Sequence, residues 1–342
     1  MVALRCDAGP LLGSGHLARA LTLADALTTR GATCLHLGST GGVAWLAEAL
    51  AARSVPSAPA PSDPAALASR CRELGVDAVL LDHYDLAPGT GAALVQAGLR
   101  VGLVEDGVWG HGQQAHVVAS PFGRPAGLGE PWPGELLLAG PAYAPVSDAV
   151  RTARAARERH ESTPLHVVTV FGGTDAADAS ATLVPAVLAT GLPLLLDAVV
   201  PRAETRAALA ALPRHPHQLL RLSPHREDLP HLLAAADAVV AAGGTAVWEM
   251  LCIGVPTALV AVSDNQVHVL ESLRERGLVT TLGGLEKLRG DPATLTAVLG
   301  AWLRDGDGRQ RRALAGWAAC DGRGAERVAA ALLAGVTPDA AG

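Results

Sequence analysis

The chain is poor in cysteine, and the few thiols it has are scattered. The five cysteines, an odd number, contain no C-x-x-C pair; they are Cys6, Cys34, Cys71, Cys252 and Cys320. This pattern argues against a disulfide framework and against a structural zinc site. Buried thiols without a bridge are the expectation.

An excess of positive charge and a long apolar run are also missing. The 27 Lys and Arg residues stand against 33 Asp and Glu residues, which gives a net charge of −6, and Lys287 is the only lysine. Nothing in this balance attracts nucleic acid or an anionic membrane surface. No apolar stretch reaches the roughly 18 residues that span a bilayer, and the N-terminus does not read as a signal peptide. We therefore expect a cytoplasmic protein without nucleic-acid or membrane partners, and the sequence does not indicate its oligomeric state.

Short apolar runs alternate with helical, alanine- and leucine-rich stretches along all 342 residues. That length corresponds to roughly two domains. Continuous apolar strands separated by helices predict an α/β fold in which parallel sheets are covered on both faces. The expected strands are residues 2–5, 33–37, 78–81, 101–104, 166–171, 193–199, 238–241 and 257–260, and the expected helices include 16–30, 43–52, 65–74 and 179–189.

A charged stretch near the middle of the chain predicts the domain boundary. We expect a first Rossmann-like domain over residues 1–150, a linker over 151–163 and a second Rossmann-like domain over 164–324. A C-terminal helix and tail then occupy residues 325–342. Two such halves are expected to face each other across a cleft.

The first candidate site follows the first strand. Gly13 and Gly15 lead into a helix whose free N–H groups suit a phosphate or a developing anion, although the spacing is not the dinucleotide fingerprint. His16 begins that helix, where a neutral imidazole is favoured and suits general-base work. The alternative is a histidine that merely packs. Asp7 either orients His16 or pairs with Arg19.

The second candidate site follows the strand at residues 78–81. The polar residues Asp82, His83, Tyr84 and Asp85 stand at the carboxyl end of that strand, which is the ligand edge of an open α/β sheet. The alternative is a simple turn in which Tyr84 packs. His83 and Asp82 are also the alternatives to His16 as the base.

Two glycine turns follow strands of the second half and offer helix-start N–H groups to phosphate. Glu249 comes four residues after the second turn, on the same helix face, where a carboxylate can accept the hydroxyls of a ribose. The alternative is a solvated capping glutamate. The turns consist of Gly172, Gly173 and Thr174, and of Gly243, Gly244 and Thr245.

Polar residues also end the strand at 257–260, where Asn265 and Gln266 are expected to point into the same cleft. The sequence contains no H-E-x-x-H motif, no Walker lysine and no acidic cluster of metal-site type. We therefore expect neither a metal nor a cofactor.

Together these motifs resemble one family in order and spacing. The motifs are Arg5-x-Asp7, Gly13-x-Gly15-His16-x-x-Arg19, Leu81-Asp82-His83-Tyr84, Phe171-Gly172-Gly173-Thr174-Asp175, Gly243-Gly244-Thr245 with Glu249, Asn265-Gln266, Leu138-Ala139-Gly140-Pro141-x-Tyr143 and Asp321-Gly322-Arg323-Gly324-Ala325. The family contains the UDP-sugar hydrolase of pseudaminic acid biosynthesis and spore-coat polysaccharide biosynthesis proteins. It is similar to inverting glycosyltransferases of the two-Rossmann-domain (GT-B) type.

The resemblance implies a role for each motif. His16 would be the base at the anomeric carbon, the two glycine turns would hold the diphosphate of UDP, and Glu249 would hold the ribose. Tyr84 and Asn265 would line the sugar and nucleophile region and, with Asp7, complete the catalytic set. The substrate would also touch Arg5, Gly15, Asp82, His83 and Gln266. UDP would leave without a metal, and the C-terminal helix would cross back onto the first domain.

Two departures from the family pattern lie where substrate or acceptor is chosen. They are residues 143–148, which lack the expected arginine, and the segment that follows Glu105 and Asp106 at residues 107–111. With the arginine-rich, lysine-poor composition of a GC-rich genome, they favour an inverting transfer from a UDP-sugar to a small acceptor. One example is a nucleobase that accepts glucuronate in nucleoside antibiotic biosynthesis. The alternative is hydrolysis, with water as the nucleophile.

Overall fold

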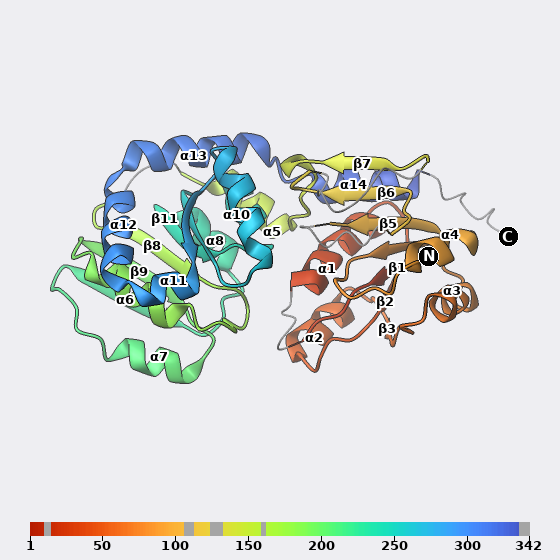
Figure 1. Cartoon of the computed structure of the whole chain (residues 1–342), viewed down its shortest axis with the longest axis horizontal. Helices are drawn as coiled ribbons and strands as arrows, with labels where there is room; N and C mark the ends of the chain where they lie inside the picture. The colour runs from red at the N-terminus through yellow and green to blue at the C-terminus, as the bar shows by residue number, and fades with distance from the viewer. Residues whose placement is uncertain (10–14, 106–112, 124–132, 159–161, 335–342) are drawn as a thin grey trace. The chain divides into compact units, whose positions relative to one another are not determined.

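The computed structural model describes residues 1–9, 15–105, 113–123, 133–158 and 162–334 (Figure 1). The chain divides into two compact units. Unit 1 takes in Met1–Val146 and the segment that starts at Gly322, and unit 2 is Ser147–Asp321. Gly13 of the first glycine loop and the segment 106–111 singled out above lie outside the described residues.

Unit 1 contains a seven-stranded sheet in the order β3-β2-β1-β4-β5-β6-β7, and every pair of neighbours is parallel. The sequence favours this arrangement because β1, β2, β4 and β6 are buried along their whole length. The strands are β1 (Val2–Arg5), β2 (Cys34–Leu37), β3 (Ser57–Ala58), β4 (Ala78–Leu81), β5 (Arg100–Val104), β6 (Val117–Ser120) and β7 (Leu136–Ala139).

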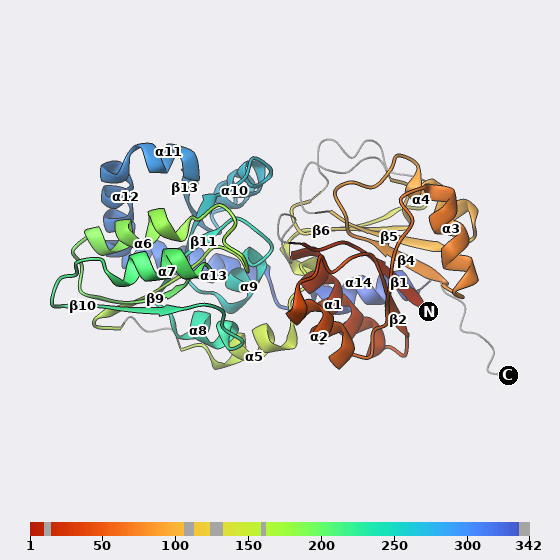
Figure 2. The same ribbon diagram turned by 90° about the horizontal axis from the view of Figure 1, so that it is seen from below.

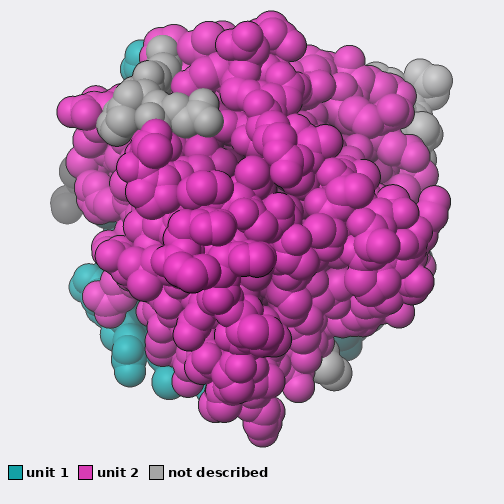
Figure 3. All heavy atoms as spheres, turned by 90° about the vertical axis from the view of Figure 1, so that its left-hand side faces the viewer, with its two compact units in different colours: residues 1–146, 322–342 teal, residues 147–321 magenta. Residues whose placement is uncertain are grey.

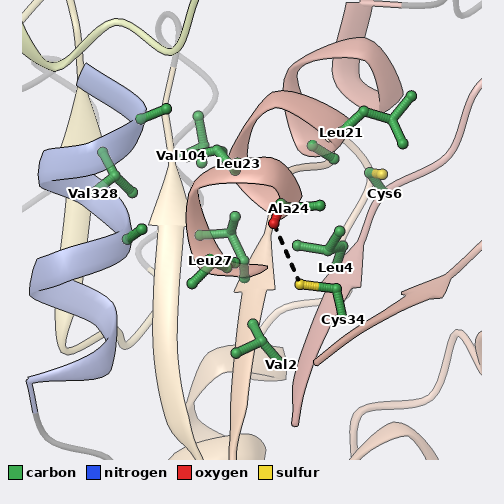
Figure 4. Close-up of a cluster of buried hydrophobic side chains, with 14 of the residues drawn as sticks. Val2, Leu4, Cys6, Leu21, Leu23, Ala24, Leu27, Cys34, Val104 and Val328 are labelled. Atoms are coloured by element: carbon green, nitrogen blue, oxygen red, sulfur yellow. Dashed lines mark hydrogen bonds between the residues drawn. The ribbon is translucent and has the colours of Figure 1, made fainter. Parts of the chain in front are cut away.

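Helices cover both faces of this sheet (Figure 2). One apolar cluster joins the sheet to α1, α2 and α14, and Figure 4 shows Val328 of α14 beside Val104 and the α1 leucines. A second cluster joins the opposite face to α3 and α4. The helices are α1 (Gly15–Thr28), α2 (Ala44–Ala52), α3 (Pro64–Glu73), α4 (Thr90–Gln96), the short 3-10 helix η1 (Pro141–Tyr143) and α14 (Gly324–Leu333).

Unit 2 contains a six-stranded parallel sheet in the order β10-β9-β8-β11-β12-β13. The strands are β8 (Leu165–Val170), β9 (Leu194–Val199), β10 (Gln218–Ser223), β11 (Ala238–Ala242), β12 (Thr257–Ala261) and β13 (Thr280–Gly284). The helices are α5 (Asp148–Ala156), α6 (Ser180–Ala189), α7 (Ala203–Ala210), α8 (Leu229–Ala235), α9 (Val247–Ile253), α10 (Asn265–Glu275), α11 (Leu285–Gly290), α12 (Pro292–Arg304) and α13 (Gly306–Ala319).

The predicted fold class, α/β with two Rossmann-like units and parallel sheets, is confirmed. The eight predicted strands are present within one or two residues of their predicted ends. The strands that sequence patterning missed include β3, β7, β10 and β13, which form the edges of the two sheets. Edge strands are half exposed, so they lack the continuous apolar run by which the central strands are recognised.

The first part of the linker predicted over residues 151–163 lies in helix α5, which starts at Asp148 and belongs to unit 2. Ser147 caps the helix by accepting a hydrogen bond from the N–H of Val150 at 3.4 Å. Arg157, just after α5, donates from Nη1 to the carbonyl of Ala234 at 2.6 Å and to that of Ala236 at 2.9 Å. The unit boundary therefore falls before Ser147, and Figure 3 draws unit 2 in magenta from that residue onward.

The last described helix, α14, is part of unit 1. It packs against α1 and against η1, and Arg327 donates to the carbonyl of Ala142 at 2.7 Å. Gly324 opens the helix at a point where a Cβ atom would come within 2.2 Å of the carbonyl oxygen of Ala144, so a larger residue has no room. Among the described residues, no helix is both long and apolar enough to cross a membrane.

Arg154 gives a test of the assignment of α5 to unit 2. Its Nη1 donates to the carbonyl oxygens of Cys252 at 2.6 Å, Trp317 at 3.0 Å and Cys320 at 2.9 Å, and its guanidinium lies 4.0 Å from the centroid of a Trp317 ring. Arg154→Met leaves these partly buried carbonyls unpaired, which costs about 2–4 kcal/mol. We expect Tm in a thermal melt to fall by roughly 5–12 °C.

Arg151 on the same helix provides the matched control. It makes an exposed ion pair with Asp148, which is worth about 0–1 kcal/mol. Arg151→Met should therefore leave Tm nearly unchanged. Equal melting of the two variants would contradict the role given to α5 in unit 2.

Candidate functional site

In each sheet, one pair of neighbouring strands marks the point where the strand order reverses. These pairs are β1 and β4 in unit 1, and β8 and β11 in unit 2. Open parallel sheets bind ligands outside the carboxyl ends of their strands at such a point. Asp7 follows β1, Asp82 follows β4, Gly172 follows β8 and Gly243 follows β11. The sequence motifs therefore gather at the ligand-binding edge of each unit.

His16, the second residue of α1, is held by a buried carboxylate. Its Nδ1 lies 2.6 Å from Oδ1 of Asp82. Arg19 lies three residues further, on the same face of α1, and donates to both oxygens of Asp82, from Nε at 2.7 Å and from Nη2 at 2.5 Å. Within the described part of the chain, Nε2 of His16 has no hydrogen-bond partner.

Asp82 is ionised in this arrangement. Burial acts to raise the pKa of its carboxyl, but the charges of Arg19 and His16 and their hydrogen bonds outweigh burial and hold the pKa well below its usual range. A carboxylate on the Nδ1 side favours the tautomer in which Nδ1 carries the proton and Nε2 can accept one. His16 therefore has the geometry of a general base that a carboxylate orients.

Tyr84 packs against the ring of this histidine. The ring centroids of His16 and Tyr84 are 4.3 Å apart, and their planes are inclined by 81°, which is an edge-to-face contact. Together with the bond to Asp82, this contact restricts rotation of the imidazole. The structure thus brings His16, Asp82 and Tyr84 together, from two separate predicted motifs.

Asp7 does not orient His16 and does not pair with Arg19, which corrects both predicted roles. Its Oδ2 lies 2.7 Å from Nε2 of His83 and 3.2 Å from Nη1 of Arg5, and its Oδ1 accepts from the N–H of Ser39 at 2.7 Å. The reason is that His16 and Arg19, the two side chains of α1, already bind Asp82. The sequence could not show which aspartate binds His16, because Asp7 and Asp82 both follow strands that end at the same edge of the sheet.

His83 is unsuited to act as the base. Its Nδ1 accepts a hydrogen bond from the N–H of Asp85 at 2.9 Å, so Nε2 carries the proton and donates it to Asp7. Both ring nitrogens are thereby occupied. Within the described residues, His16 keeps a nitrogen free to accept a proton and His83 does not.

In unit 2, the turn after β8 is exposed and shaped by glycine. Gly172 has a φ of +85°, a conformation that glycine adopts without strain, and Gly172 and Gly173 are both exposed. Asp175, five residues before the first residue of α6, accepts hydrogen bonds from the N–H groups of Ala179 at 2.8 Å and Ser180 at 3.1 Å. The carboxylate therefore ties the turn to the start of α6, a role that was not predicted.

The turn after β11 is covered by α10. A Cβ atom on Gly243 would lie 2.2 Å from Cδ1 of Leu270, so a larger residue would have to displace the Leu270 side chain. Gln266 reaches the same turn from α10, and its Oε1 accepts from the N–H of Val262 at 3.0 Å. Asn265 beside it receives a hydrogen bond from the hydroxyl of Ser263 at 2.5 Å. Gln266 thus packs against the predicted phosphate turn, whereas Asn265 starts α10.

Glu249 stands in the first turn of α9, directly after the Gly243–Gly244–Thr245 turn. Burial raises the pKa of its carboxyl to about 7. Among the described residues, the carboxylate has no hydrogen-bond partner. The side chain is partly exposed, so the carboxylate can meet a hydrogen-bond donor from outside the chain.

Within the described residues, no group of three or more His, Cys, Asp or Glu side chains is placed to hold a metal ion. The predicted joint site, which combines Tyr84 and His16 with Asn265 and the glycine turns, draws residues from both units. Its assembly across a cleft stays a prediction, and so do the substrate contacts expected of Arg5, Gly15 and Thr174.

Comparison with known proteins gives structural but no sequence matches. No protein-family model matches the chain, and no curated protein sequence is significantly similar to it. Among solved structures, MurG of Acinetobacter baumannii is similar with 17% identity over 97% of this chain and 99% of that one, at a TM-score of 0.73. MnaA of S. aureus with UDP shows 14% identity, coverage of 97% and 96% and a TM-score of 0.63. VinC with dTDP shows 16% identity, coverage of 98% and 100% and a TM-score of 0.60.

Likeness at this level of identity shows the fold. The fold of this chain is of the two-Rossmann-domain (GT-B) type, as the sequence predicts. The finer resemblance to the pseudaminic-pathway hydrolase family rests on the sequence motifs alone.

The raised pKa of Glu249 predicts a pH-dependent stability. Between pH 4.5, its usual pKa, and about 7, the unfolded chain loses this proton while the folded chain keeps it, so stability falls as pH rises through this window. Glu249→Gln removes the titration. We expect its Tm to exceed that of the wild type by an amount that grows from pH 4.5 to pH 8.

The exposed Glu271 of α10 serves as the control. Glu271→Gln should show no growing difference in Tm over the same pH range. A constant difference between Glu249→Gln and the wild type at pH 5 and pH 8 would refute the assigned environment of Glu249.

Proposed function

We propose that this protein is an inverting enzyme that attacks the anomeric carbon of a UDP-sugar and releases UDP. The observation that carries the proposal is His16, whose Nδ1 is held by ionised Asp82 while Nε2 is free. A base oriented in this way can deprotonate a nucleophile as the bond to the leaving group breaks.

In this proposal, unit 2 binds UDP. The turns at Gly172–Gly173–Thr174 and Gly243–Gly244–Thr245 offer backbone N–H groups to the diphosphate, and the unpaired carboxylate of Glu249 accepts the ribose hydroxyls. The solved structures of similar fold include one with UDP and one with dTDP, which supports a nucleotide at this edge.

Unit 1 supplies the base in this proposal. When Nε2 of His16 takes a proton, the imidazolium that forms is stabilised by the Asp82 carboxylate. Arg19 keeps that carboxylate ionised, so the proton stays on the histidine rather than passing to the aspartate. Tyr84 keeps the ring in place. UDP leaves with its charge stabilised by backbone N–H groups, without need of a metal or cofactor.

The nucleophile is either a small acceptor or water. We favour transfer to a small acceptor, for example a nucleobase with UDP-glucuronate as donor, because residues 143–148 depart from the motif of the hydrolase family. Hydrolysis is the alternative. Release of UDP in a single turnover, measured with and without candidate acceptors across a panel of UDP-sugars, separates the two, because hydrolysis proceeds without any acceptor.

Replacing His16 tests the base. His16→Asn keeps a polar side chain but removes the basic nitrogen, and loss of a general base commonly costs about 10²–10⁴ in rate. We expect kcat for UDP release to fall at least about a hundredfold, with the Kd for UDP unchanged in calorimetry. His231→Asn, on an exposed position of α8, is the control and should keep full kcat. A His16→Asn variant with nearly full kcat would show that His16 only packs.

Metal independence is tested separately. The sequence has no D-x-D pair beside either glycine turn, and that pair is the usual holder of a divalent ion at a diphosphate. Turnover should therefore persist in EDTA at its original rate. Loss of turnover in EDTA that magnesium or manganese restores would contradict this part of the proposal.

A further inference from the structure

The carboxylate of Asp7 has no use in the proposed base mechanism, yet it is built into the same edge of unit 1. It stands directly after β1, and its partner His83 is the chain neighbour of Asp82, which holds His16. The two Asp–His pairs therefore lie side by side at the β1/β4 switch point.

Asp7 is held rigidly from three sides. The N–H of Ser39 reaches Oδ1 at 2.7 Å, His83 donates to Oδ2 at 2.7 Å, and Arg5 lies 3.2 Å from Oδ2. Gly38 makes room for this, because a Cβ atom there would come within 2.7 Å of Oδ1 of Asp7 and 1.8 Å of the Cys6 carbonyl oxygen. Its position is thus fixed before any ligand arrives.

Despite these partners, Asp7 is accessible and has acceptor capacity left. Its side chain is 23% exposed, whereas that of Asp82 is 2% exposed. A carboxylate offers about four acceptor positions, and Oδ1 uses only one of its own on Ser39. The exposed part of the side chain leaves the carboxylate open to a donor from solution.

The charges around Asp7 limit what that donor can be. Arg5 is 7% exposed and balances the negative charge of Asp7, and His83 is neutral in the tautomer described above. Because the cluster carries no net charge, it favours neither a metal cation nor an anion, and the exposed atoms of the carboxylate can only accept hydrogen bonds. The chemistry that fits is a neutral O–H donor.

Asp7 cannot replace His16 as a base. Burial acts to raise the pKa of its carboxyl, but the hydrogen bond from His83, the charge of Arg5 and the bond from Ser39 hold the pKa well below its usual range. A carboxylate of such low basicity accepts hydrogen bonds without taking the proton.

We propose that Asp7 accepts a hydrogen bond from a hydroxyl of the sugar that reacts beside His16, and that it thereby selects the sugar. This inference rests on the proposed function and names a residue that discriminates between its substrates. Arg5, His83 and Ser39 act as positioning residues for the carboxylate.

The test compares dissociation constants of the full chain and its variants for a set of related ligands. Wild-type protein, Asp7→Asn and Asp7→Ala are titrated with UDP, with the UDP-hexose that binds most tightly from a panel, and with the monodeoxy analogues of that UDP-hexose. Ala removes the acceptor altogether. Asn keeps a neutral oxygen for Ser39 and places an NH2 group, which cannot accept from His83, where Asp7 has Oδ2. Asp77→Asn, at the opposite end of β4, is the matched control.

We expect one deoxy analogue to bind the wild type roughly 10- to 100-fold more weakly than the parent sugar, the effect of losing a charge-assisted hydrogen bond. Asp7→Ala should bind the parent that much more weakly, lose discrimination against this one analogue, and keep the Kd for UDP. Asp7→Asn should show the same change to a smaller extent, because its oxygen accepts without a charge. The control should match the wild type throughout.

Four other outcomes are decisive. The role of Asp7 would be overturned if the Asp7 variants bind the parent sugar with the wild-type Kd. It would also be overturned if, for the parent and for every deoxy analogue alike, the Kd rises by the same factor between the wild type and the variant. Loss of UDP binding as well would show that Asp7 only maintains the fold. Failure of the wild type to bind UDP and every UDP-hexose would instead refute the proposed function, and the inference with it.

Discussion

Parallel pairing of β1 with β4, and of β8 with β11, is the constraint on which the rest of this structure depends. Because each pair joins strands whose connections run in opposite directions across the sheet, the loops after them separate and leave an edge without a covering helix. The backbone N–H groups and side chains of those loops are therefore available to a ligand. The motifs of His16, Tyr84 and Glu249 and the two glycine turns each follow one of these four strands, whereas Asn265 and Gln266 follow β12.

At the edge of unit 1, two aspartates of the same type acquire different tasks from their surroundings. Asp82 is enclosed by α1 and spends both oxygens on Arg19 and His16. Asp7 faces Arg5 and His83 and keeps part of its surface exposed. In both clusters an arginine supplies the positive charge that keeps a carboxylate ionised, which leaves the proton on a histidine nitrogen. The buried carboxylate of Asp82 orients a base, whereas the partly exposed carboxylate of Asp7 can accept a hydrogen bond from a ligand.

Arginine also organises unit 2, in a chain that contains a single lysine. Arg154 and Arg157 donate hydrogen bonds to backbone carbonyl groups that lack helical partners at the ends of α8, α9 and α13. The fork of donors on a guanidinium can reach several carbonyls at once, which one ammonium group does less well. Glu249 stands in the first turn of the same helix α9, so the arginine contacts at one end of α9 support the candidate ribose site at the other.

The sequence by itself determined the α/β class, most of the central strands and the motifs at their ends, because apolar runs and glycine turns are local patterns; the buried strand β6 was missed. It singled out His16 and Tyr84 in separate motifs, and the structure brings their rings into contact. Only the tertiary structure decided that Asp82 rather than Asp7 holds His16, and that His83 has no free nitrogen. Only the tertiary structure also turned the expected linker into α5 and brought Ser39 to Asp7. Each of these outcomes depends on which of several similar polar groups meet across residues far apart in the chain, and that choice is made by packing rather than by local pattern.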